Sequence, residues 1–588
     1  MEDAALFHAA DSLFPQDPIF TSLLSLAREF GKKVIVHDPA AGTEATYNQL
    51  ITDIIHAQHL LRQPLLPYLD GQGRILKSTY HIGVLAPANY EFVVAAFAIL
   101  ALGGTVVALP VTVSPETILD DYLRTSPVKV ILYGTRFRNQ ATHLQAYDPA
   151  VRRRVFTAPT PTLNQSIYTP SSTLSTDLQT ETGTPTDIGA ARQSPIPATR
   201  PGIVFFSSGS TGTPKGVIHS RAIFHPLQRA AADEGQLIYR AASWITGSLP
   251  LIETLLTGAR AEIVEPTAGP EEVWERVRQR RVTALCSSVM LFDEMAAYWK
   301  SHIKQLPAAQ RDEYKGGLKC LTHTAIGGSM PCPKLLRFWR QDLGVRLTVM
   351  YGSTETGGKG LTVVWPDDEV ELDRNLGKQR FPSRPIKLSE RDHGELLVGG
   401  LTTFLGYLNG PDATDPRIFN AEGYYKTGDI AHKVGEYYIF DGRASIDFIK
   451  TANGPVPVQL VEQTLSSLPC IETGYVVPVP DKLLGRRVGV IARFVPSPAE
   501  GDNSRTNGIR IGKDTPKARG LLTIRRDLAQ LGHLPAHMLP TAFRMLGENE
   551  RLPLTLSAKV LKERVLEQFF PLSPSGAFLE DVEVWTGA

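Results

Sequence analysis

The stretch IVFFSSGSTGTPKGVIHS, from Ile203 to Ser220, decides how the rest of the chain is interpreted. Its first four residues are large and apolar, which predicts a short buried strand. A loop of glycine and hydroxyl residues follows, and a lysine closes it. Glycine lets the backbone approach an anion closely, and successive N–H groups, hydroxyls and one lysine are donors for phosphate oxygens. The loop therefore predicts a polyphosphate site, with the candidate ligands Ser207, Ser208, Gly209, Ser210, Thr211, Gly212 and Lys215.

Two other interpretations of this loop are weighed against phosphate binding. A Walker loop needs Gly-Lys followed by Ser or Thr at the start of a helix, whereas Lys215 follows Pro214 and precedes Gly216. A flexible Ser/Gly surface loop would have the same composition. The apolar strand before the loop and the lysine within it favour phosphate binding.

The composition of the whole chain excludes several classes of protein. The chain has 588 residues, of which 42% are hydrophobic and 21% charged, enough for several globular domains. A net charge of +1 gives no overall field, so neither nucleic acid nor an anionic membrane is an expected partner. The cysteines show no CxxC spacing, which suits a reducing compartment. The N-terminus lacks a leader pattern and residues 92–109 are interrupted by glycines, so we expect no membrane span and a cytoplasmic location.

The order of apolar segments predicts an α/β fold. HIGVLAPAN, YEFVVAAFAILALGG and TVVALP, within residues 81–110, read as strand, helix and strand, which is a βαβ unit with a parallel sheet. The same alternation continues to about residue 288 and returns, in a smaller α/β region, over residues 446–588. Residues 158–201 are rich in Thr, Ser and Pro and are expected to form a mobile insertion.

The run SSGSTGTPKG resembles the phosphate-loop signature of the adenylate-forming superfamily, which includes acyl-CoA synthetases, luciferases and peptide-synthetase adenylation domains. YGSTE (351–355), TGD (427–429) and a terminal lysine motif (551–565) follow in family order over nearly the whole chain. The resemblance implies a large multi-subdomain N-terminal domain, residues 1–443, and a small mobile C-terminal α/β domain, residues 444–588. The hinge would be at Gly-Arg-Ala-Ser, residues 442–445.

Two glycine-bearing motifs supply candidates for binding the rest of the nucleotide. The turn Gly327, Gly328 and Ser329 is similar to the family turn that lies against adenine. In YGSTE, Tyr351 offers a flat face for a purine and Gly352 leaves room beside it. Thr354 is a donor for the α-phosphate, and Glu355 offers the carboxylate oxygen that Mg²⁺ prefers. Alone, this motif would describe a turn with a solvated glutamate; after the phosphate loop, nucleotide binding is favoured.

Three further residues are assigned roles by the resemblance. Asp429 of the TGD motif would accept hydrogen bonds from the ribose hydroxyls, and Arg443 would lie near ribose and phosphate. Lys559 matches the catalytic lysine, with Ala558 where the family usually has glycine. Lysines are usually solvated, but the surrounding match favours catalysis for Lys559.

The sequence identifies the pocket for the carboxylic acid less clearly than the nucleotide site. Its candidates are Trp244, Ser248, Ile326 and Gly358. Ser248 stands where the family often has a histidine or an aromatic residue, and Trp244 is as well explained by a place in the core. Arg260 is a candidate partner for a second carboxylate, such as that of malonate, although a solvated arginine is the favoured interpretation.

The loop after Arg443 departs from the family pattern. Lys450 and Gly454 match the acceptor loop with a shift of one residue. Pro455 and Pro457 replace aromatic or basic residues and remove backbone donors. The resemblance thus supports ATP more firmly than coenzyme A as a substrate.

The resemblance implies a reaction in two steps. A carboxylic acid attacks the α-phosphorus of Mg·ATP to give an acyl-adenylate and pyrophosphate, and Lys559 neutralises the charge that develops. The small domain then rotates and a thiol enters, with coenzyme A as the first choice of acceptor. The alternatives are transfer to an amine or to a carrier-protein thiol, and a non-catalytic nucleotide-binding protein of the same fold.

Overall fold

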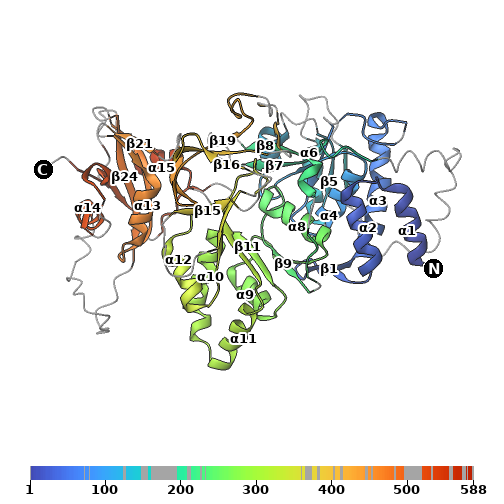
Figure 1. Cartoon of the computed structure of the whole chain (residues 1–588), viewed down its shortest axis with the longest axis horizontal. Coiled ribbons are helices and arrows are strands. Elements are labelled where there is room, and N and C mark those ends of the chain that lie inside the picture. The colour runs from blue at the N-terminus through green and yellow to red at the C-terminus, as the bar shows by residue number, and fades with distance from the viewer. Residues whose placement is uncertain are drawn as a thin grey trace.

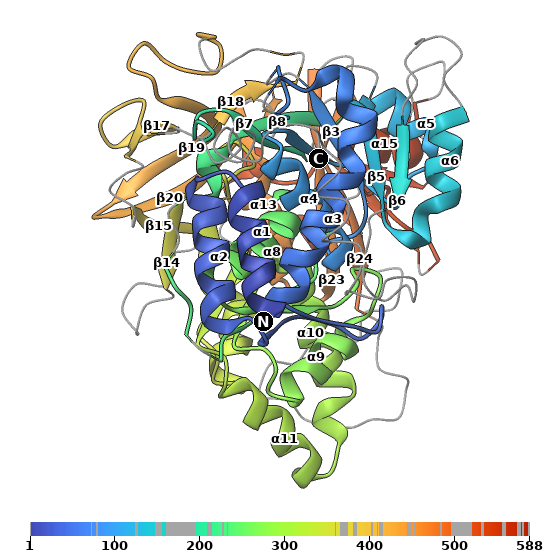
Figure 2. The same ribbon diagram turned by 90° about the vertical axis from the view of Figure 1, so that its right-hand side faces the viewer.

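The computed structural model describes residues 2–71, 73–77, 80–123, 128–146, 156–159, 195–207, 214–225, 228–231, 233–358, 360–364, 374–379, 385–400, 404–408, 410, 415–443, 448–451, 454–481, 485–495, 520–530, 534–547, 549–554, 560–572, 578 and 581–585. The N-terminal helices and the C-terminal elements lie at opposite ends of the long axis (Figure 1). Turned by 90°, the molecule presents α1 (Glu2–Leu13) and α2 (Pro18–Phe30) to the viewer (Figure 2).

Seven strands form the sheet that carries the phosphate-loop stretch, in the order β18-β8-β7-β4-β3-β5-β6. β3 pairs in parallel with β4, and α4 (Tyr90–Ala101) connects them, so the predicted βαβ unit is confirmed. The strands are β3 (His81–Leu85), β4 (Thr105–Ala108), β5 (Val128–Tyr133), β6 (Phe156–Pro159), β7 (Pro201–Ser207), β8 (Lys215–Ser220) and β18 (Phe404–Tyr407). Both ends of the predicted insertion therefore lie in strands, β6 and β7, and residues 160–194 lie outside the described residues.

A second sheet of thirteen strands has the order β16-β17-β19-β20-β15-β14-β13-β12-β11-β9-β10-β1-β2. Its members are β1 (Val34–Asp38), β2 (Thr43–Thr46), β9 (Gly235–Ile238), β10 (Arg260–Ile263), β11 (Ala284–Ser288), β12 (His323–Gly327), β13 (Thr348–Tyr351), β14 (Leu361–Val364), β15 (Asn375–Gln379), β16 (Ile386–Leu388), β17 (His393–Val398), β19 (Tyr425–Val434) and β20 (Tyr437–Arg443). From β1 to β13 along this order, neighbouring strands are parallel. The pairs from β13 onwards are antiparallel.

Helices cover both faces of the parallel strands. The longer ones, besides α1, α2 and α4, are α3 (Tyr47–Leu65), α6 (Arg138–Ala146), α8 (Ile245–Thr257), α9 (Pro270–Arg278), α10 (Val289–Ser301) and α11 (Ala308–Leu318). Shorter ones are α5 (Pro115–Thr117), α12 (Pro333–Arg337), η6 (Ile303–Gln305) and η7 (Phe338–Asp342). One apolar core joins α2, α3, α4 and α8 to both sheets, and a second joins α9, α10 and α12 to β11, β12 and β13. The predicted α/β class is confirmed.

The residues after Arg443 form sheets of their own. β21 (Phe448–Thr451) pairs with β22 (Gly454–Pro457), and a four-stranded sheet contains β23 (Ile471–Asp481), β24 (Gly485–Phe494), β25 (Ala542–Met545) and β26 (Val582–Val584). The helices α13 (Val458–Ser467), α14 (Leu521–Gln530) and α15 (Lys562–Phe569) pack on this sheet. Across all the residues that the structure describes, no helix has the length and apolar character needed to cross a membrane.

A buried ion pair ties the N-terminal helices to the phosphate-loop stretch. Arg221, directly after β8, donates to the Asp17 carboxylate and to the Leu100 carbonyl oxygen (2.9 Å). Asp17 also accepts a hydrogen bond from the Phe20 N–H (3.2 Å) and so caps α2. Both charged side chains are at most 2% exposed. Because water does not reach either side chain, each charge is stabilised by its partner instead.

Replacing Asp17 with Ala is expected to lower the free energy of unfolding by about 3–5 kcal/mol, because it leaves the Arg221 guanidinium buried without its counter-charge. Asp11→Ala is the control, since Asp11 and its partner Arg28 are both about half exposed and their ion pair is expected to contribute less than about 1 kcal/mol. Urea unfolding followed by circular dichroism measures both. Equal losses for the two variants would contradict the assignment.

Candidate functional site

The phosphate-loop stretch forms an antiparallel hairpin. β7 pairs with β8 so that Ser207 lies opposite Lys215, and Lys215 is exposed. The Phe206 N–H, at the end of β7, donates to the Ser243 carbonyl oxygen (3.1 Å), which brings the hairpin next to the start of α8. Five of the predicted phosphate ligands, residues 208–212, lie outside the described residues, so their role stays a prediction.

The Gly327 turn lies at the carboxyl edge of the parallel strands. β12 ends at Gly327 beside the end of β13, and a Cβ at Gly327 would lie 2.7 Å from the Met350 carbonyl oxygen. Gly328 has a φ of +83°, which favours glycine, and Ser329 after it is exposed. Ligands of open α/β sheets bind at this edge.

Tyr351 and Arg443 both donate hydrogen bonds to Asp429, although the three residues were predicted from three separate motifs. The Tyr351 hydroxyl donates to Oδ2 of Asp429 (2.6 Å), and Arg443 Nε donates to Oδ1 of the same carboxylate (2.6 Å). Asp429 and Arg443 are also paired across β19 and β20. Burial raises the pKa of the Tyr351 hydroxyl, and the negative charge of Asp429 raises it further. Tyr351 therefore stays protonated and is a permanent donor to the Asp429 carboxylate.

Glu355 is held by a tyrosine from another strand. The Tyr407 hydroxyl, from β18, donates to Oε1 of Glu355 (2.8 Å). Burial and then the Glu355 charge raise the pKa of the Tyr407 hydroxyl, so it also remains a donor. His219 of β8 approaches the Thr354 carbonyl oxygen with Nε2 at 2.8 Å, which places the ring proton on Nε2. The backbone and the carboxylate of this turn are thus both oriented.

The phosphate hairpin and the Glu355 turn share one strand pair. Tyr407 lies opposite Val217 in the β18–β8 ladder, and the Leu408 N–H donates to the Gly216 carbonyl oxygen (2.7 Å). The exposed Lys215 and the Glu355 carboxylate are therefore positioned by the same piece of sheet.

The acid-pocket candidates occupy different environments. Trp244 is half-buried and precedes α8, while Ser248 is fully buried and donates to the Ala242 carbonyl oxygen (2.8 Å). Ile326 is also fully buried, and Gly358 has a φ of +70° in the turn after Glu355. In this structure, neither Ser248 nor Ile326 exposes a side chain to a ligand.

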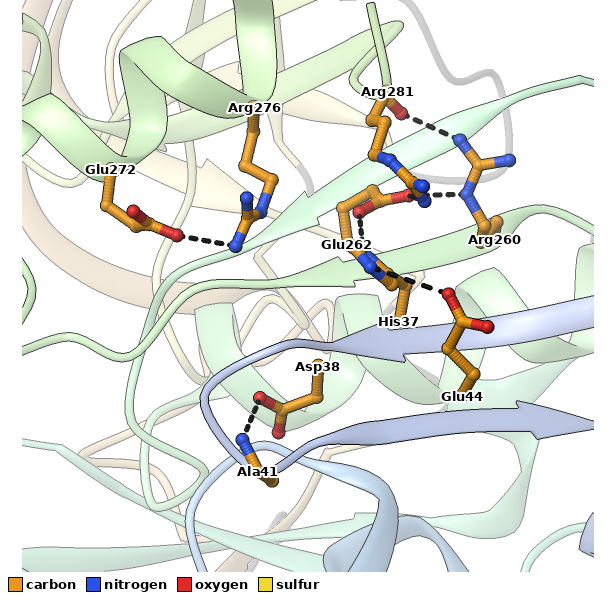
Figure 3. A network of polar contacts seen from close by, with 9 residues as sticks. All are labelled: His37, Asp38, Ala41, Glu44, Arg260, Glu262, Glu272, Arg276 and Arg281. Atoms are coloured by element: carbon orange, nitrogen blue, oxygen red, sulfur yellow. Dashed lines mark hydrogen bonds and ion pairs between the residues drawn. The ribbon is translucent and has the colours of Figure 1, made fainter. Parts of the chain in front are cut away.

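Arg260 belongs to a charge network of the sheet (Figure 3). Its Nε donates to Oε1 of Glu262 (2.5 Å), and its Nη2 donates to the Arg281 carbonyl oxygen (3.0 Å). Glu262 is fully buried and also contacts His37 Nδ1 through Oε2 (2.6 Å). The guanidinium is therefore engaged within the protein rather than simply solvated, and the pairing of Arg260 with a second substrate carboxylate remains untested.

Two further site predictions concern the C-terminal region. Lys450 lies in β21 opposite Pro455, and Gly454 begins β22, so both stand in the same small hairpin. Lys559 and residues 444–447 lie outside the described residues, as does the Lys450 side chain. The roles of Lys450, Gly454 and Lys559 remain predictions.

Sequence reasoning missed Tyr407, His219 and Glu395. Glu395 accepts a hydrogen bond from the Gly428 N–H (2.8 Å), next to Asp429, where Gly428 has a φ of +73°. His219 lies in the phosphate-loop stretch but outside its glycine and hydroxyl residues, and no local motif marks Tyr407 or Glu395, because each of the three acts through a contact between distant segments. The only available signal was a tyrosine following glycine in TTFLGYLN, which the sequence presents as an ordinary strand.

Comparison with known proteins places this chain in a family. Residues 72–408, more than half of the chain, match the model of the AMP-binding enzymes. The chain is 32% identical over 579 residues to the acyl-CoA ligase oryP of Aspergillus oryzae, with 97% of this chain and 95% of that protein covered.

Solved structures show the same fold. The anthranilate CoA ligase AuaEII bound to anthranoyl-AMP matches with a TM-score of 0.70 at 16% identity, covering 94% of this chain and 97% of that one. The o-succinylbenzoate CoA synthetase of Bacillus subtilis bound to ATP and magnesium matches with a TM-score of 0.65 at 18% identity, covering 92% and 98%. The chain belongs to the AMP-binding enzyme family, and the predicted adenylate-forming superfamily is confirmed.

Proposed function

We propose that the chain is an ATP-dependent acyl-CoA ligase, which activates a carboxylic acid as an acyl-adenylate and transfers the acyl group to coenzyme A. The name of the relative from Aspergillus oryzae supports both the AMP-forming chemistry and a CoA acceptor. The observation that carries the proposal is the cluster of Tyr351, Asp429 and Arg443 beside the oriented Glu355. Its four side chains match the donors and acceptors of a nucleotide.

The proposed ribose site is the Asp429 carboxylate. It is 3% exposed and fixed by two donors before any nucleotide binds, so little ordering remains to be done on binding. The proposed adenine site is the Gly327 turn with the ring of Tyr351. A Cβ at Gly360 would lie only 2.5 Å from the Tyr351 carbonyl oxygen. Any other residue at position 360 would therefore displace the Tyr351 backbone, so the position of Tyr351 depends on this glycine.

Magnesium would be held by Glu355 together with phosphate oxygens. A carboxylate is the ligand this hard cation prefers, and the Tyr407 hydroxyl orients the carboxylate for it. When bound, the ion would withdraw negative charge from the phosphates. Thr354 and Lys215 would add a hydroxyl and a positive charge for phosphate oxygens, together with the loop residues 207–212.

The small C-terminal domain, proposed as residues 444–588, would supply Lys559 for the first step. The separate sheets after Arg443 support this division of the chain. Lys450 and Gly454 would border the path of the thiol in the second step. An amine or a carrier-protein thiol is the alternative acceptor. It is supported by Pro455 and Pro457 in β22, which remove backbone donors from the proposed acceptor loop.

A cytoplasmic location is supported by four free cysteines.

A panel of carboxylic acids tests the proposal. Purified chain with Mg·ATP should release pyrophosphate only with certain acids, hydroxylamine should trap the adenylate as a hydroxamate, and coenzyme A should convert it to a thioester seen by HPLC. Hydroxamate formation without a CoA thioester would favour the amine or carrier-protein acceptor. Absence of pyrophosphate release with every acid would favour a non-catalytic binding protein.

Asp429→Asn is expected to raise the KM for ATP about ten- to a hundredfold, since a neutral amide replaces the charged acceptor for ribose and for Arg443. Asp415→Asn serves as the matched control, because Asp415 also binds an arginine, Arg417, whose side chain is 77% exposed. Steady-state pyrophosphate release against ATP concentration measures both variants. An unchanged KM for Asp429→Asn would remove Asp429 from the ribose site.

A further inference from the structure

A cavity of about 560 Å³ opens between α10, η6, α11, α12 and η7, in the lobe drawn below the sheets in Figure 1. Six cationic side chains line it, and they come from α10, η6, α11 and α12: Lys300, Lys304, Arg311, Lys315, Lys334 and Arg337. Its volume is within the range of small-molecule sites. The nucleotide site described above does not use this cavity.

The positive charge of this cavity is not explained by the overall composition of the chain. The chain has 61 basic and 60 acidic residues, yet the cavity lining contains one acid, Asp342. Of the acids on the neighbouring helices, Glu313 of α11 pairs with Arg278, and Asp293 of α10 interacts electrostatically with the lining residue Lys300. Among the described residues, Lys304, Lys315 and Lys334 make no ion pair within 4 Å. Like charges gathered in a concavity repel one another and concentrate the positive potential there.

The cavity shares no lining residue with the proposed nucleotide site. α10 begins directly after β11 and α12 begins shortly after β12, so both start at the carboxyl edge of the sheet, where Gly327 lies. The cavity contains Lys300 and Asp342, at the far ends of α10 and η7. The other side of the cavity is formed by Lys334 and Arg337 of α12, so the cavity extends from the far end of α10 towards that edge.

We propose that this cavity is a second ligand site, which binds a small, multiply phosphorylated anion. Phosphate oxygens are strong hydrogen-bond acceptors for lysine and arginine, and several phosphates on one molecule can contact cations from more than one of the lining helices at once. An apolar side chain also lines the cavity: Phe338 is 8% exposed, and Lys300 Nζ lies 4.2 Å from the centre of its ring. The ligand would join α10 to α11 and α12 and so stabilise this lobe.

A small anion fits this site better than an acidic protein segment. Protein partners bind through broad surfaces whose cores are depleted of charge, whereas here the cations converge on one concavity. Free oligophosphate and a phosphorylated nucleotide, such as the 3′-phosphorylated end of coenzyme A, share the chemistry that the cavity recognises. The experiment therefore includes both.

Isothermal titration of the full chain with inorganic triphosphate tests the proposal. We expect two binding events: Lys215→Ala should weaken one, at the phosphate hairpin, and Lys304→Ala/Lys315→Ala should weaken the other by about tenfold or more. The double variant should retain wild-type pyrophosphate release, since neither lysine belongs to the nucleotide site. The matched control is Lys319→Ala, an exposed lysine at the end of α11 that does not line the cavity.

Two further titrations identify the ligand. If adenosine 3′,5′-bisphosphate competes for the cavity event, the proposal holds with a nucleotide as the source; if it does not, the proposal holds with free oligophosphate. Hexaglutamate tests the protein alternative. Binding of hexaglutamate but not triphosphate to the cavity, or equal triphosphate binding by wild type and the double variant, overturns the proposal.

Discussion

Replacing Glu355 with glutamine is expected to lower acid-dependent pyrophosphate release about a hundred- to a thousandfold, because the site loses the charge proposed to hold magnesium where negative charge develops. Glutamine has nearly the same shape and still accepts the hydrogen bond from Tyr407, so the fold should survive. The measurement is kcat for pyrophosphate release at saturating ATP, with Mg²⁺ varied.

Tyr407→Phe separates the charge of Glu355 from its orientation. This variant keeps the carboxylate but removes the donor that lies 2.8 Å from Oε1, and one such hydrogen bond corresponds to about a tenfold change in rate. We expect part of that loss to be recovered at high Mg²⁺. Glu422→Gln is the control, since Glu422 pairs with Lys387 at the surface. Full activity of Glu355→Gln at low Mg²⁺ would show that another residue holds the metal.

Lys559→Ala is expected to lower acid-dependent pyrophosphate release by more than about a hundredfold and to leave thiolysis of supplied acyl-adenylate near the wild-type rate. The physical reason is that the lysine charge opposes the charge that builds between carboxylate and α-phosphate, which concerns the first step alone. The residues that flank the lysine loop, Leu554 and Val560, are joined by an antiparallel bridge, so the loop ends are anchored. Both half-reactions can be followed separately by HPLC.

Lys562→Ala is the matched control for Lys559→Ala. Lys562 stands three residues further on, at the start of α15, and forms an ion pair with Glu462 (3.4 Å). It should retain both half-reactions. If Lys559→Ala slows the two half-reactions equally, Lys559 does not act in the first step alone. That result would contradict the proposal that the small domain rotates away with Lys559 before the second step.

Elements with strong local periodicity were predictable from sequence. The run from Tyr90 to Ala101 is almost wholly apolar and is followed by two glycines, and it forms α4 as expected. The pairing of strands was not predictable in the same way. β18 joins β8, and β1 joins β10, although long stretches of chain separate the partners. Such pairings depend on the whole core rather than on any window of sequence.

The same distinction applies to the site. Tyr351, Asp429 and Arg443 each stand in a recognisable motif, and the structure brings Tyr351 and Arg443 within hydrogen-bond distance of Asp429. Tyr407 stands in no motif, and its role follows only from the β18–β8 pairing. The acid pocket was the least predictable part, because shape and polarity there depend on packing: the Ser248 hydroxyl is used inside its own helix start.

The buried contact between Arg221 and Asp17 has a practical consequence for work with shortened chains. The segment that matches the family begins at residue 72, which makes it an attractive place to trim the gene. A polypeptide cut there would lack Asp17, and the guanidinium beside the phosphate hairpin would have to recruit water into an apolar interior. We expect such a truncation to precipitate or to expose the hairpin to proteases, even though every recognised motif would still be encoded.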